Sequence, residues 1–137
     1  SDVYKRQRLR MTTLYQVAAA NKGIVVGTGN KVEDFGVGFY TKYGDGGVDI
    51  SPIADCNKTE VWELGKELNI LKEIIEAPPT DGLWDDGRTD EGQLGLSYTE
   101  LEEAMNNENS INRDKYIKIR NANLHKMDPI PVCKIPK

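Results

Sequence analysis

Gly23-Ile24-Val25-Val26-Gly27 is the clearest indication of a strand in this sequence of 137 residues. A short, continuous apolar run bounded by glycines is typical of a strand buried in a parallel sheet. Residues 8–20, just before it, predict an amphipathic helix, because apolar side chains recur there at helical spacing: Met11, Leu14, Tyr15 and Ala18. A helix followed directly by a buried strand indicates an α/β protein.

Two capping boxes mark helix starts further along the chain. Asn57 with Glu60 predicts a helix that begins near Lys58, and Ser97 with Glu100 predicts a second, short helix. In each box the first side chain caps an N–H group inside the helix, and the carboxylate three residues later reaches back to the capping residue. Both starts are therefore specified by local sequence.

Prolines and charged residues delimit the remaining segments. Pro78-Pro79 ends the helical structure that begins near Lys58, because proline lacks a backbone N–H. Residues 80–95 are acidic, contain glycine and do not match the EF-hand pattern, so we expect a mobile surface loop. A basic helix is predicted from about Arg113 to Leu124, and residues 128–131 predict an extended, proline-stiffened tail.

The predicted sheet is incomplete. Only residues 23–27 and a weaker segment at 48–53 indicate strands, and two parallel strands cannot form a core, because each face must be covered and each edge protected. We therefore expect an α/β chain with a partial parallel sheet and flanking helices, whose N-terminal half lies upstream. Residues 1–7 fit nothing that follows, and we expect them to be a non-native leader. Residues 8–137 would then be the C-terminal part of one domain.

Composition restricts the classes of function. With 38% hydrophobic and 29% charged residues the chain resembles globular proteins, and its net charge of -4 argues against a nucleic-acid partner. No apolar run is long enough to cross a bilayer, and no charged-then-apolar leader opens the chain, so we expect no membrane partner and a cytoplasmic location. Cys56 and Cys133 lie far apart and His125 is the single histidine. We expect free thiols and no zinc site.

Residues 27–34 directly follow the predicted strand, where ligands bind in open α/β sheets. Thr28 offers a hydroxyl, the neighbouring glycines expose backbone N–H groups to a phosphate, and Glu33 offers a hard oxygen ligand for Mg2+. The same residues also suit a plain turn with a capping threonine and a surface acid, and their spacing alone favours that turn.

Lys42-Tyr43-Gly44-Asp45-Gly46-Gly47-Val48-Asp49 interleaves glycines with acids. Such a segment suits a backbone wrapped around a polar ligand, and an acidic hairpin turn is an equal alternative. Lys58, at the head of a predicted helix, can reach a phosphate beside the helix N–H groups, although alone it suits a solvated surface lysine. His125-Lys126 alone suits a charged helix end.

A family resemblance appears at Gly36-Val37-Gly38-Phe39-Tyr40-Thr41-Lys42-Tyr43-Gly44-Asp45-Gly46-Gly47-Val48-Asp49. The sequence resembles the synthetase domain of NAD synthetases, which belong to the N-type ATP pyrophosphatase superfamily, over nearly the whole chain. Further motifs match in order: Arg8-Leu9-Arg10-Met11, Gly27-Thr28 with Glu33, Pro79-Thr80 and His125-Lys126. The resemblance implies an adenine nucleotide alpha hydrolase-like fold, of which this chain is the C-terminal part.

The resemblance also implies a role for each matching residue. It assigns ATP binding to Thr28, Lys58 and Thr80, and a magnesium ligand to Glu33. It assigns deamido-NAD binding to Arg8, Lys42, Asp49, His125 and Lys126. Asp45 is a candidate for the ammonia site, and Asp45 and Lys58 are the expected catalytic residues.

The activity that the resemblance implies is amidation of deamido-NAD to NAD, with ATP and Mg2+. The nicotinate carboxylate attacks the α-phosphorus of ATP and releases pyrophosphate, and ammonia then displaces AMP. Magnesium and Lys58 would offset the charge on the phosphates, while residues 80–95 would act as a lid that excludes water. The family also implies a homodimer, and the short segment after His125 favours ammonia over glutamine as the nitrogen donor.

One family motif does not occur in the sequence: the Ser-Gly-Gly-x-Asp-Ser loop that grips pyrophosphate. The resemblance also stops at residue 7, where Tyr4 and Gln7 replace the asparagine and the alanine or proline typical of the family. We therefore expect a truncated chain that is inactive alone. The alternatives are a fragment of a glutamine-dependent NAD synthetase, another enzyme of the superfamily such as a GMP synthetase or a tRNA-thiolating protein, and a non-catalytic dinucleotide-binding module. The Lys-Tyr-Gly-Asp-Gly-Gly motif and the terminal His-Lys argue against the other superfamily enzymes.

Overall fold

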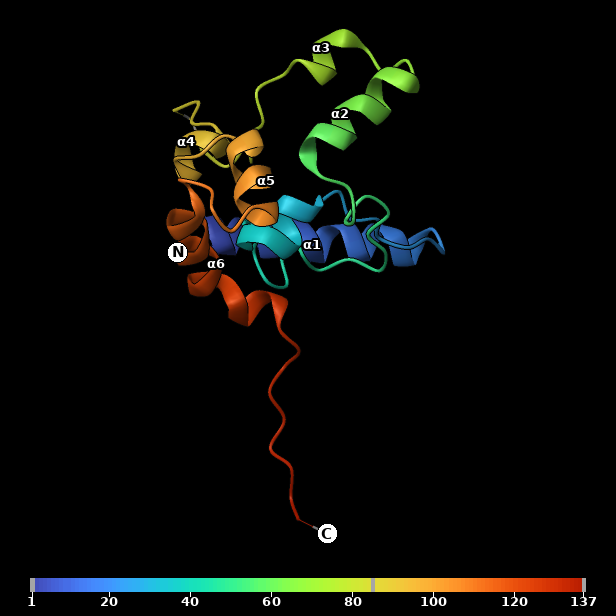
Figure 1. Ribbon diagram of the computed structural model, residues 1–137. Coiled ribbons are helices and arrows are strands. Elements are labelled where there is room, and N and C mark those ends of the chain that lie inside the picture. The colour runs from blue at the N-terminus through green and yellow to red at the C-terminus, as the bar shows by residue number, and fades with distance from the viewer. Residues whose placement is uncertain (1, 85, 137) are drawn as a thin grey trace.

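The computed structural model describes residues 2–84 and 86–136. Its helical elements are α1 (Asp2–Ala20), η1 (Val32–Val37), α2 (Lys58–Glu67), α3 (Lys72–Ile75), α4 (Asp90–Leu94), α5 (Tyr98–Asn106) and α6 (Arg113–Met127). Figure 1 shows α2 and α3 projecting from one end of the molecule and the segment after α6 running away from the other end. Among the described residues, no helix combines the length and the apolar character that a membrane span requires.

The helix starts predicted from capping boxes are confirmed. The carboxylate of Glu60 accepts the N–H of Asn57 at 2.7 Å at the start of α2. At the start of α5 the Ser97 hydroxyl accepts the N–H of Glu100 at 3.2 Å, while Glu100 accepts the N–H of Ser97 at 2.8 Å. The basic helix is also confirmed as α6, which continues to Met127.

The acidic segment 80–95 is not loop throughout. It contains the short helix α4, because the Thr89 hydroxyl accepts the N–H of Gly92 at 3.1 Å and caps its start. The helical region before it is also divided, since α2 ends at Glu67 and Asn69 adopts a φ of 53° before α3. Residue 85 of the predicted lid lies outside the described residues.

The first helix, α1, is longer than predicted and little of it is buried. It begins at Asp2, so described residues of the predicted leader form its first turns; residue 1 lies outside the described part. Within α1 only Gln7 is buried, whereas Leu14 is 56% exposed and Val17 is 54% exposed. The apolar side of α1 is therefore not covered by the described part of the chain.

The predicted strands do pair, but they do not form a sheet. No strand is present between residues 2 and 84 or between 86 and 136, and a single parallel bridge joins Val26 to Ile50. The N–H of Gly27 donates to the Ile50 carbonyl at 2.7 Å. Ile24 is 60% exposed and Val26 is 52% exposed. The two segments lack the further strands that would extend the ladder and cover these side chains, which is why the expected partial parallel sheet is reduced to one bridge.

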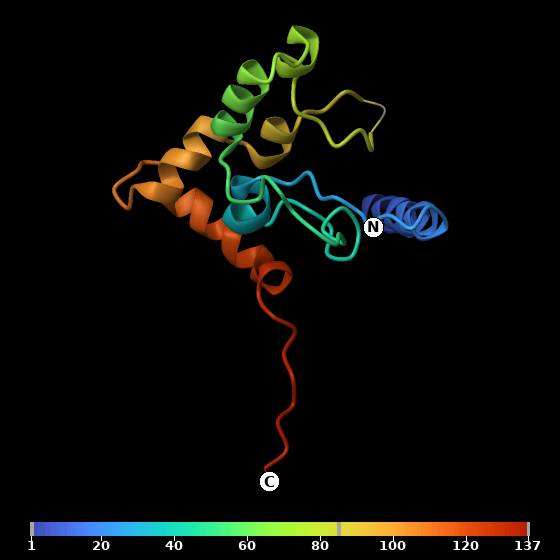
Figure 2. The same cartoon turned by 90° about the vertical axis from the view of Figure 1, so that its right-hand side faces the viewer.

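The hydrophobic core lies where η1 packs against α5 and α6. Val32 and Val37 of η1 are fully buried, as are Tyr98 and Leu101 of α5. Figure 2 shows α1 on the opposite side of the molecule from this core, with the loops between η1 and α2 in between. The core therefore holds η1 firmly, and η1 carries Glu33, the predicted magnesium ligand.

The η1 helix is specified at both ends. At its start the side-chain oxygen of Asn30 accepts the N–H groups of Val32 at 3.0 Å and Glu33 at 3.1 Å, and Asn30 is almost fully buried. At its end Gly38 has a φ of 67°, and a Cβ there would lie 2.6 Å from the Cβ of Asn123 on α6. A π-helix is rare and often occurs at a functional site. From η1, the side chain of Glu33 reaches Tyr98 of α5.

Candidate functional site

Glu33 and Lys58, which the resemblance assigns to magnesium and ATP, meet in the structure. The Lys58 ammonium lies 3.4 Å from Oε1 of Glu33, and the two side chains are 20% and 16% exposed. Glu33 also accepts the N–H of Asn30 at 3.3 Å through its other oxygen. A partly buried pair of opposite charges from two elements therefore occupies this end of the site.

Tyr98 contacts both members of this pair. Its hydroxyl donates to Oε1 of Glu33 at 2.5 Å, which is the short distance expected for a hydrogen bond to an ionised acceptor. The Lys58 ammonium lies 4.9 Å from the centre of the Tyr98 ring, and the Trp62 ring meets that ring edge-on at 6.3 Å. Burial and the nearby carboxylate of Glu33 raise the pKa of Tyr98 above its usual range.

Tyr98 was not among the residues predicted from the sequence, where only the cap at its neighbour Ser97 was recognised. A usable indication was present: Tyr98, Leu101 and Met105 follow helical spacing on the inner side of α5. A tyrosine on the core side of a helix needs a hydrogen-bond partner for its hydroxyl. The identity of that partner could not be predicted, because Glu33 lies 65 residues away in the sequence.

Asp90 is a second residue of this site that was not predicted from the sequence. It is 7% exposed, and its Oδ2 lies 3.4 Å from the Tyr98 hydroxyl. Its Oδ1 is buried without a hydrogen-bond partner among the described residues. Burial, reinforced by the charge of Glu33, raises the pKa of Asp90 to about 6. Asp90 thus adds an acid with unused acceptor capacity beside Tyr98.

Four of the five residues assigned to deamido-NAD line one cavity of about 310 Å3: Arg8, Lys42, His125 and Lys126. The Lys42 ammonium donates to the His125 carbonyl at 2.6 Å, and the Arg8 guanidinium lies 3.4 Å from the Lys42 carbonyl. The structure therefore brings α1, the loop after η1 and the end of α6 together around one basic cavity.

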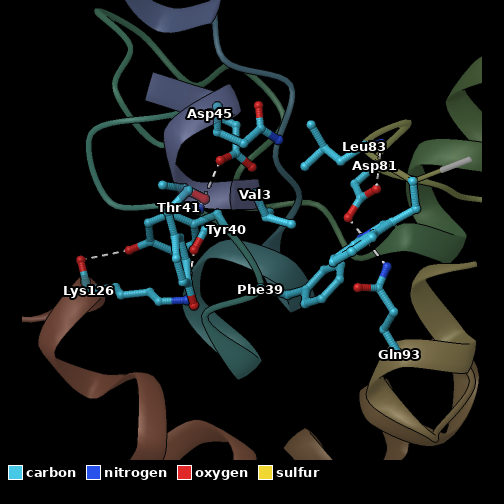
Figure 3. A pocket seen from close by; sticks show the side chains of 12 residues that line it. Val3, Phe39, Tyr40, Thr41, Asp45, Asp81, Leu83, Gln93 and Lys126 are labelled. Atoms are coloured by element: carbon cyan, nitrogen blue, oxygen red, sulfur yellow. Dashed lines mark hydrogen bonds between the residues drawn. The ribbon is translucent and has the colours of Figure 1, made fainter. Parts of the chain in front are cut away.

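Lys126 is strongly engaged with the backbone. Its ammonium donates to the carbonyls of Gly38 at 2.8 Å and Tyr40 at 2.7 Å, and the Tyr40 hydroxyl donates back to the Lys126 carbonyl at 2.7 Å. A second pocket shares Lys126 with the basic cavity and is also lined by Phe39 and Leu83. Figure 3 shows Tyr40 and Lys126 side by side at the edge of this second pocket. Burial lowers the pKa of Lys126. Lys126 thus ties the end of α6 to the loop after η1.

Asp45 lies between two pockets. Its Oδ1 accepts the N–H of Thr41 at 2.8 Å, and Figure 3 shows the carboxylate in the pocket that Tyr40 and Lys126 also line. A smaller cavity of about 140 Å3 lies on its other side and is also lined by Asp34. Although Asp45 is exposed overall, loss of water around its carboxylate raises its pKa, while Thr41 and Lys126 act in the opposite direction.

The structure does not bring the other predicted residues into these groups. Thr28 and Thr80 are exposed, and no hydrogen bond within the described ranges joins either to Lys58. The carboxylate of Asp49 accepts the N–H of Val25 at 2.7 Å and lies 3.3 Å from the Tyr15 hydroxyl. Asp49 therefore supports the β-bridge and does not line the basic cavity. Cys56 and Cys133 are free thiols, as predicted.

The residues around Glu33 fit hydrated Mg2+ but not a cage made of protein ligands alone. Within the described part of the chain, no group of three or more His, Cys, Asp or Glu side chains is arranged to hold a metal. Mg2+ does not require such a group, because it binds through one or two carboxylates, substrate phosphates and retained water molecules. Glu33 can supply one carboxylate, and the unpaired buried oxygen of Asp90 can accept a hydrogen bond from bound water.

The family is shown by comparison with known proteins. The family model described as NAD synthase matches residues 3–132, so the resemblance begins upstream of Arg8 and the expectation that it stops at residue 7 is wrong. The NH(3)-dependent NAD(+) synthetase of Alkaliphilus oremlandii is 44% identical over 136 residues, which cover 98% of this chain and 54% of that protein. The corresponding protein of Carboxydothermus hydrogenoformans is 48% identical over 97 residues, which cover 71% of this chain and 39% of that protein.

Two solved structures are also similar. NMN synthetase from Francisella tularensis superposes with a TM-score of 0.86 at 33% identity, covering 96% of this chain and 56% of that one. NH3-dependent NAD synthetase from Campylobacter jejuni, in complex with the nitrate ion, superposes with a TM-score of 0.67 at 25% identity, covering 96% and 54%. Both are consistent with an α/β synthetase fold, and the chain spans about half the length of the curated relatives it matches. The resemblance carried by the sequence motifs is thereby confirmed, and the chain belongs to the NAD synthase family.

Proposed function

We propose that residues 8–137 are the C-terminal part of a synthetase that amidates deamido-NAD to NAD with ATP and ammonia. The observation that carries this proposal is the meeting of Glu33 and Lys58 on the buried Tyr98, in a chain of the NAD synthase family. The Glu33 carboxylate can bind a metal ion and the Lys58 ammonium can bind a phosphate. Because the two groups lie together and are largely shielded from solvent, they suit the binding of a metal-bound nucleotide.

The ATP-binding part of the site would use side chains that still have hydrogen-bonding groups available. A lysine ammonium has three donors, so Lys58 can bind Glu33 and still donate to a phosphate oxygen. When bound by Glu33, Mg2+ would neutralise charge on the phosphates of ATP. The exposed hydroxyls of Thr28 and Thr80 would add contacts to ATP as the complete site closes around it.

The basic cavity would hold the dinucleotide. Arg8, Lys42 and His125 present N–H donors that match the phosphates of deamido-NAD, and Lys126 shapes the wall by fixing the loop after η1. Asp45, at the boundary of this region, would hold ammonia and accept its proton as the amide forms. Asp49 would act through the β-bridge that it supports.

We further propose that the chain is completed by upstream strands and by a second copy. Strands added beside the Val26–Ile50 bridge would complete a parallel sheet, and the exposed apolar side of α1 suits a homodimer contact. The pyrophosphate loop, which does not occur in this sequence, would lie upstream. A cytoplasmic location agrees with the free thiols.

A second candidate is a synthetase that makes NMN. It is supported by the TM-score of 0.86 with the NMN synthetase of Francisella tularensis. That substrate would be nicotinate mononucleotide, which lacks the adenylate half of deamido-NAD and so needs less of the basic cavity. The curated NH(3)-dependent NAD(+) synthetases, at 40% to 48% identity, favour the dinucleotide.

Product analysis tests both candidates. A full-length protein that contains this chain is incubated with ATP, Mg2+ and ammonium, and with either deamido-NAD or nicotinate mononucleotide. Formation of NAD and AMP with ammonium, but not with glutamine alone, is expected, together with no product from residues 8–137. Preference for nicotinate mononucleotide would replace the proposal with the second candidate, and product from neither substrate would overturn both. Lys118→Ala, at an exposed position of α6 away from the cavity, serves as a control variant and should retain activity.

A further inference from the structure

The Tyr98 hydroxyl lies between two carboxylates but can donate only one proton. Glu33 Oε1 lies at 2.5 Å and Asp90 Oδ2 at 3.4 Å, so the proton is donated to Glu33. Because Tyr98 is fully buried and its ring packs against Trp62, the hydroxyl cannot swing toward solvent. Tyr98 therefore fixes the position of one particular oxygen of Glu33.

The remaining contacts of Glu33 leave it open to a further partner. Lys58 approaches the same oxygen that Tyr98 binds, and the second oxygen of Glu33 accepts only the N–H of Asn30 at 3.3 Å. An ionised carboxylate has about four acceptor positions, so the second oxygen keeps capacity for a cation. Tyr98 and Lys58 thus orient Glu33 without using that capacity.

Asp90 supplies the second observation. It is more than nine-tenths buried, it shares the Tyr98 hydroxyl with Glu33, and its Oδ1 has no partner in the described part of the chain. Buried acceptors are nearly always satisfied by protein or by ordered water. An acceptor left unpaired beside a candidate metal ligand suits a hydrogen bond from a water molecule bound to that metal.

We propose that Tyr98 and Asp90 are positioning residues of the metal site: Tyr98 orients Glu33 for magnesium, and Asp90 accepts a hydrogen bond from a metal-bound water. The proposal assigns neither residue to the nucleotide. The proposal rests on the proposed function, because Glu33 is assigned to magnesium there. Groups that hold metal-ligating carboxylates in this way typically affect metal affinity by roughly ten- to a hundredfold.

The test measures metal affinity apart from catalysis. In the complete protein, Mn2+ replaces Mg2+, and electron paramagnetic resonance measures the concentration of free Mn2+. An ATP analogue that cannot be cleaved between the α- and β-phosphates is present throughout. The variants are Tyr98→Phe, which removes only the hydroxyl, and Asp90→Asn, which removes the charge and replaces one acceptor oxygen by an NH2 donor. Tyr116→Phe is the matched control, because Tyr116 is 5% exposed in the same core and its hydroxyl has no hydrogen bond in the described residues.

We expect Tyr98→Phe to weaken Mn2+ binding by roughly ten- to a hundredfold and Asp90→Asn by about tenfold. The KM for deamido-NAD should stay within about twofold in both, whereas the Mg2+ concentration needed for half-maximal rate should rise with the Mn2+ dissociation constant. Tyr116→Phe should leave all three quantities unchanged.

The proposal is overturned if Tyr98→Phe binds Mn2+ like the wild type, or if Tyr116→Phe weakens binding equally. Should Tyr98→Phe fail to fold, unchanged Mn2+ affinity in Asp90→Asn would overturn it instead. A wild-type protein that binds Mn2+ but forms no NAD would refute the proposed function while leaving this inference intact.

Discussion

Replacing Asp90 with asparagine should stabilise the protein at neutral pH. Asp90 is buried beside Glu33, and its pKa in the folded state is about 6, compared with 3.8 for an unperturbed aspartate. Below pH 3.8 the group is protonated in both the folded and unfolded states, so it carries no charge penalty. As the pH rises from 3.8 to about 6, the folded state loses stability, because the unfolded state ionises first; above 6 the folded state must hold a poorly solvated carboxylate and the loss is complete. Asparagine keeps the size of the side chain and removes this charge.

The size of the effect follows from the change in pKa. A difference of about two pKa units corresponds to about 3 kcal/mol, and screening by solvent reduces this to between about 1 and 3 kcal/mol. For a domain of roughly 150–250 residues each kcal/mol changes the Tm by about 2–4 °C. Asp90→Asn should therefore raise the Tm by roughly 2–10 °C at pH 7.5 and by almost nothing at pH 4.

The assay is thermal denaturation of the complete protein between pH 4 and pH 8, with a chelator present so that no metal contributes. Asp128→Asn is the control: it removes the same charge from an exposed residue just after α6, and its effect on the Tm should be small at every pH. A lower Tm for Asp90→Asn at pH 7.5, or an equal gain at pH 4 and pH 7.5, would refute the assignment of a buried, destabilising carboxylate.

Three further predictions concern other parts of the site. Glu33→Gln should lower magnesium-dependent turnover by orders of magnitude with little change in Tm, because a hard cation loses its charged ligand; unchanged rates across a Mg2+ titration would contradict this. Lys42→Ala should raise the KM for deamido-NAD, while Lys58→Ala should lower kcat, each by roughly ten- to a hundredfold in steady-state kinetics; the reverse pattern would show that the two ends of the site are misassigned. Gly38→Ala should lower the stability in urea denaturation by at least about 2 kcal/mol, because its φ of 67° is strained for alanine and the new Cβ would meet α6 at 2.6 Å. Gly87→Ala is its control, since its φ is 71° with nothing within 4 Å, and an equal loss in both would exclude the close approach as the cause.

Features that depend on neighbours in the chain were predictable from the sequence. The starts of α2 and α5 were found from the pairs Asn57 with Glu60 and Ser97 with Glu100, because each capping box is complete within four residues. The segments around Val26 and 48–53 were expected to be extended, and a single parallel bridge joins them. The family could be recognised because its motifs are contiguous stretches of sequence.

Features that depend on distant contacts were not predictable. Burial of Glu33 and Lys58 against Tyr98 results from packing η1 and α2 against α5, and no local pattern specifies which hydroxyl will meet which carboxylate. The hydrogen bonds from Lys126 to the loop after η1 also depend on tertiary packing, because the acceptor carbonyls lie 86 and 88 residues away in the sequence.

The incomplete sheet also depends on both local sequence and distant contacts. An apolar run such as residues 23–27 indicates that a segment can pair, because strand propensity is a property of its own side chains. Whether it becomes a strand depends on the partners available on both edges, and the segment at 48–53 supplies only one of them. Local sequence therefore determined the helix starts and the pairing tendency, whereas tertiary packing decided which side chains meet, because those contacts join residues that only the folded chain brings together.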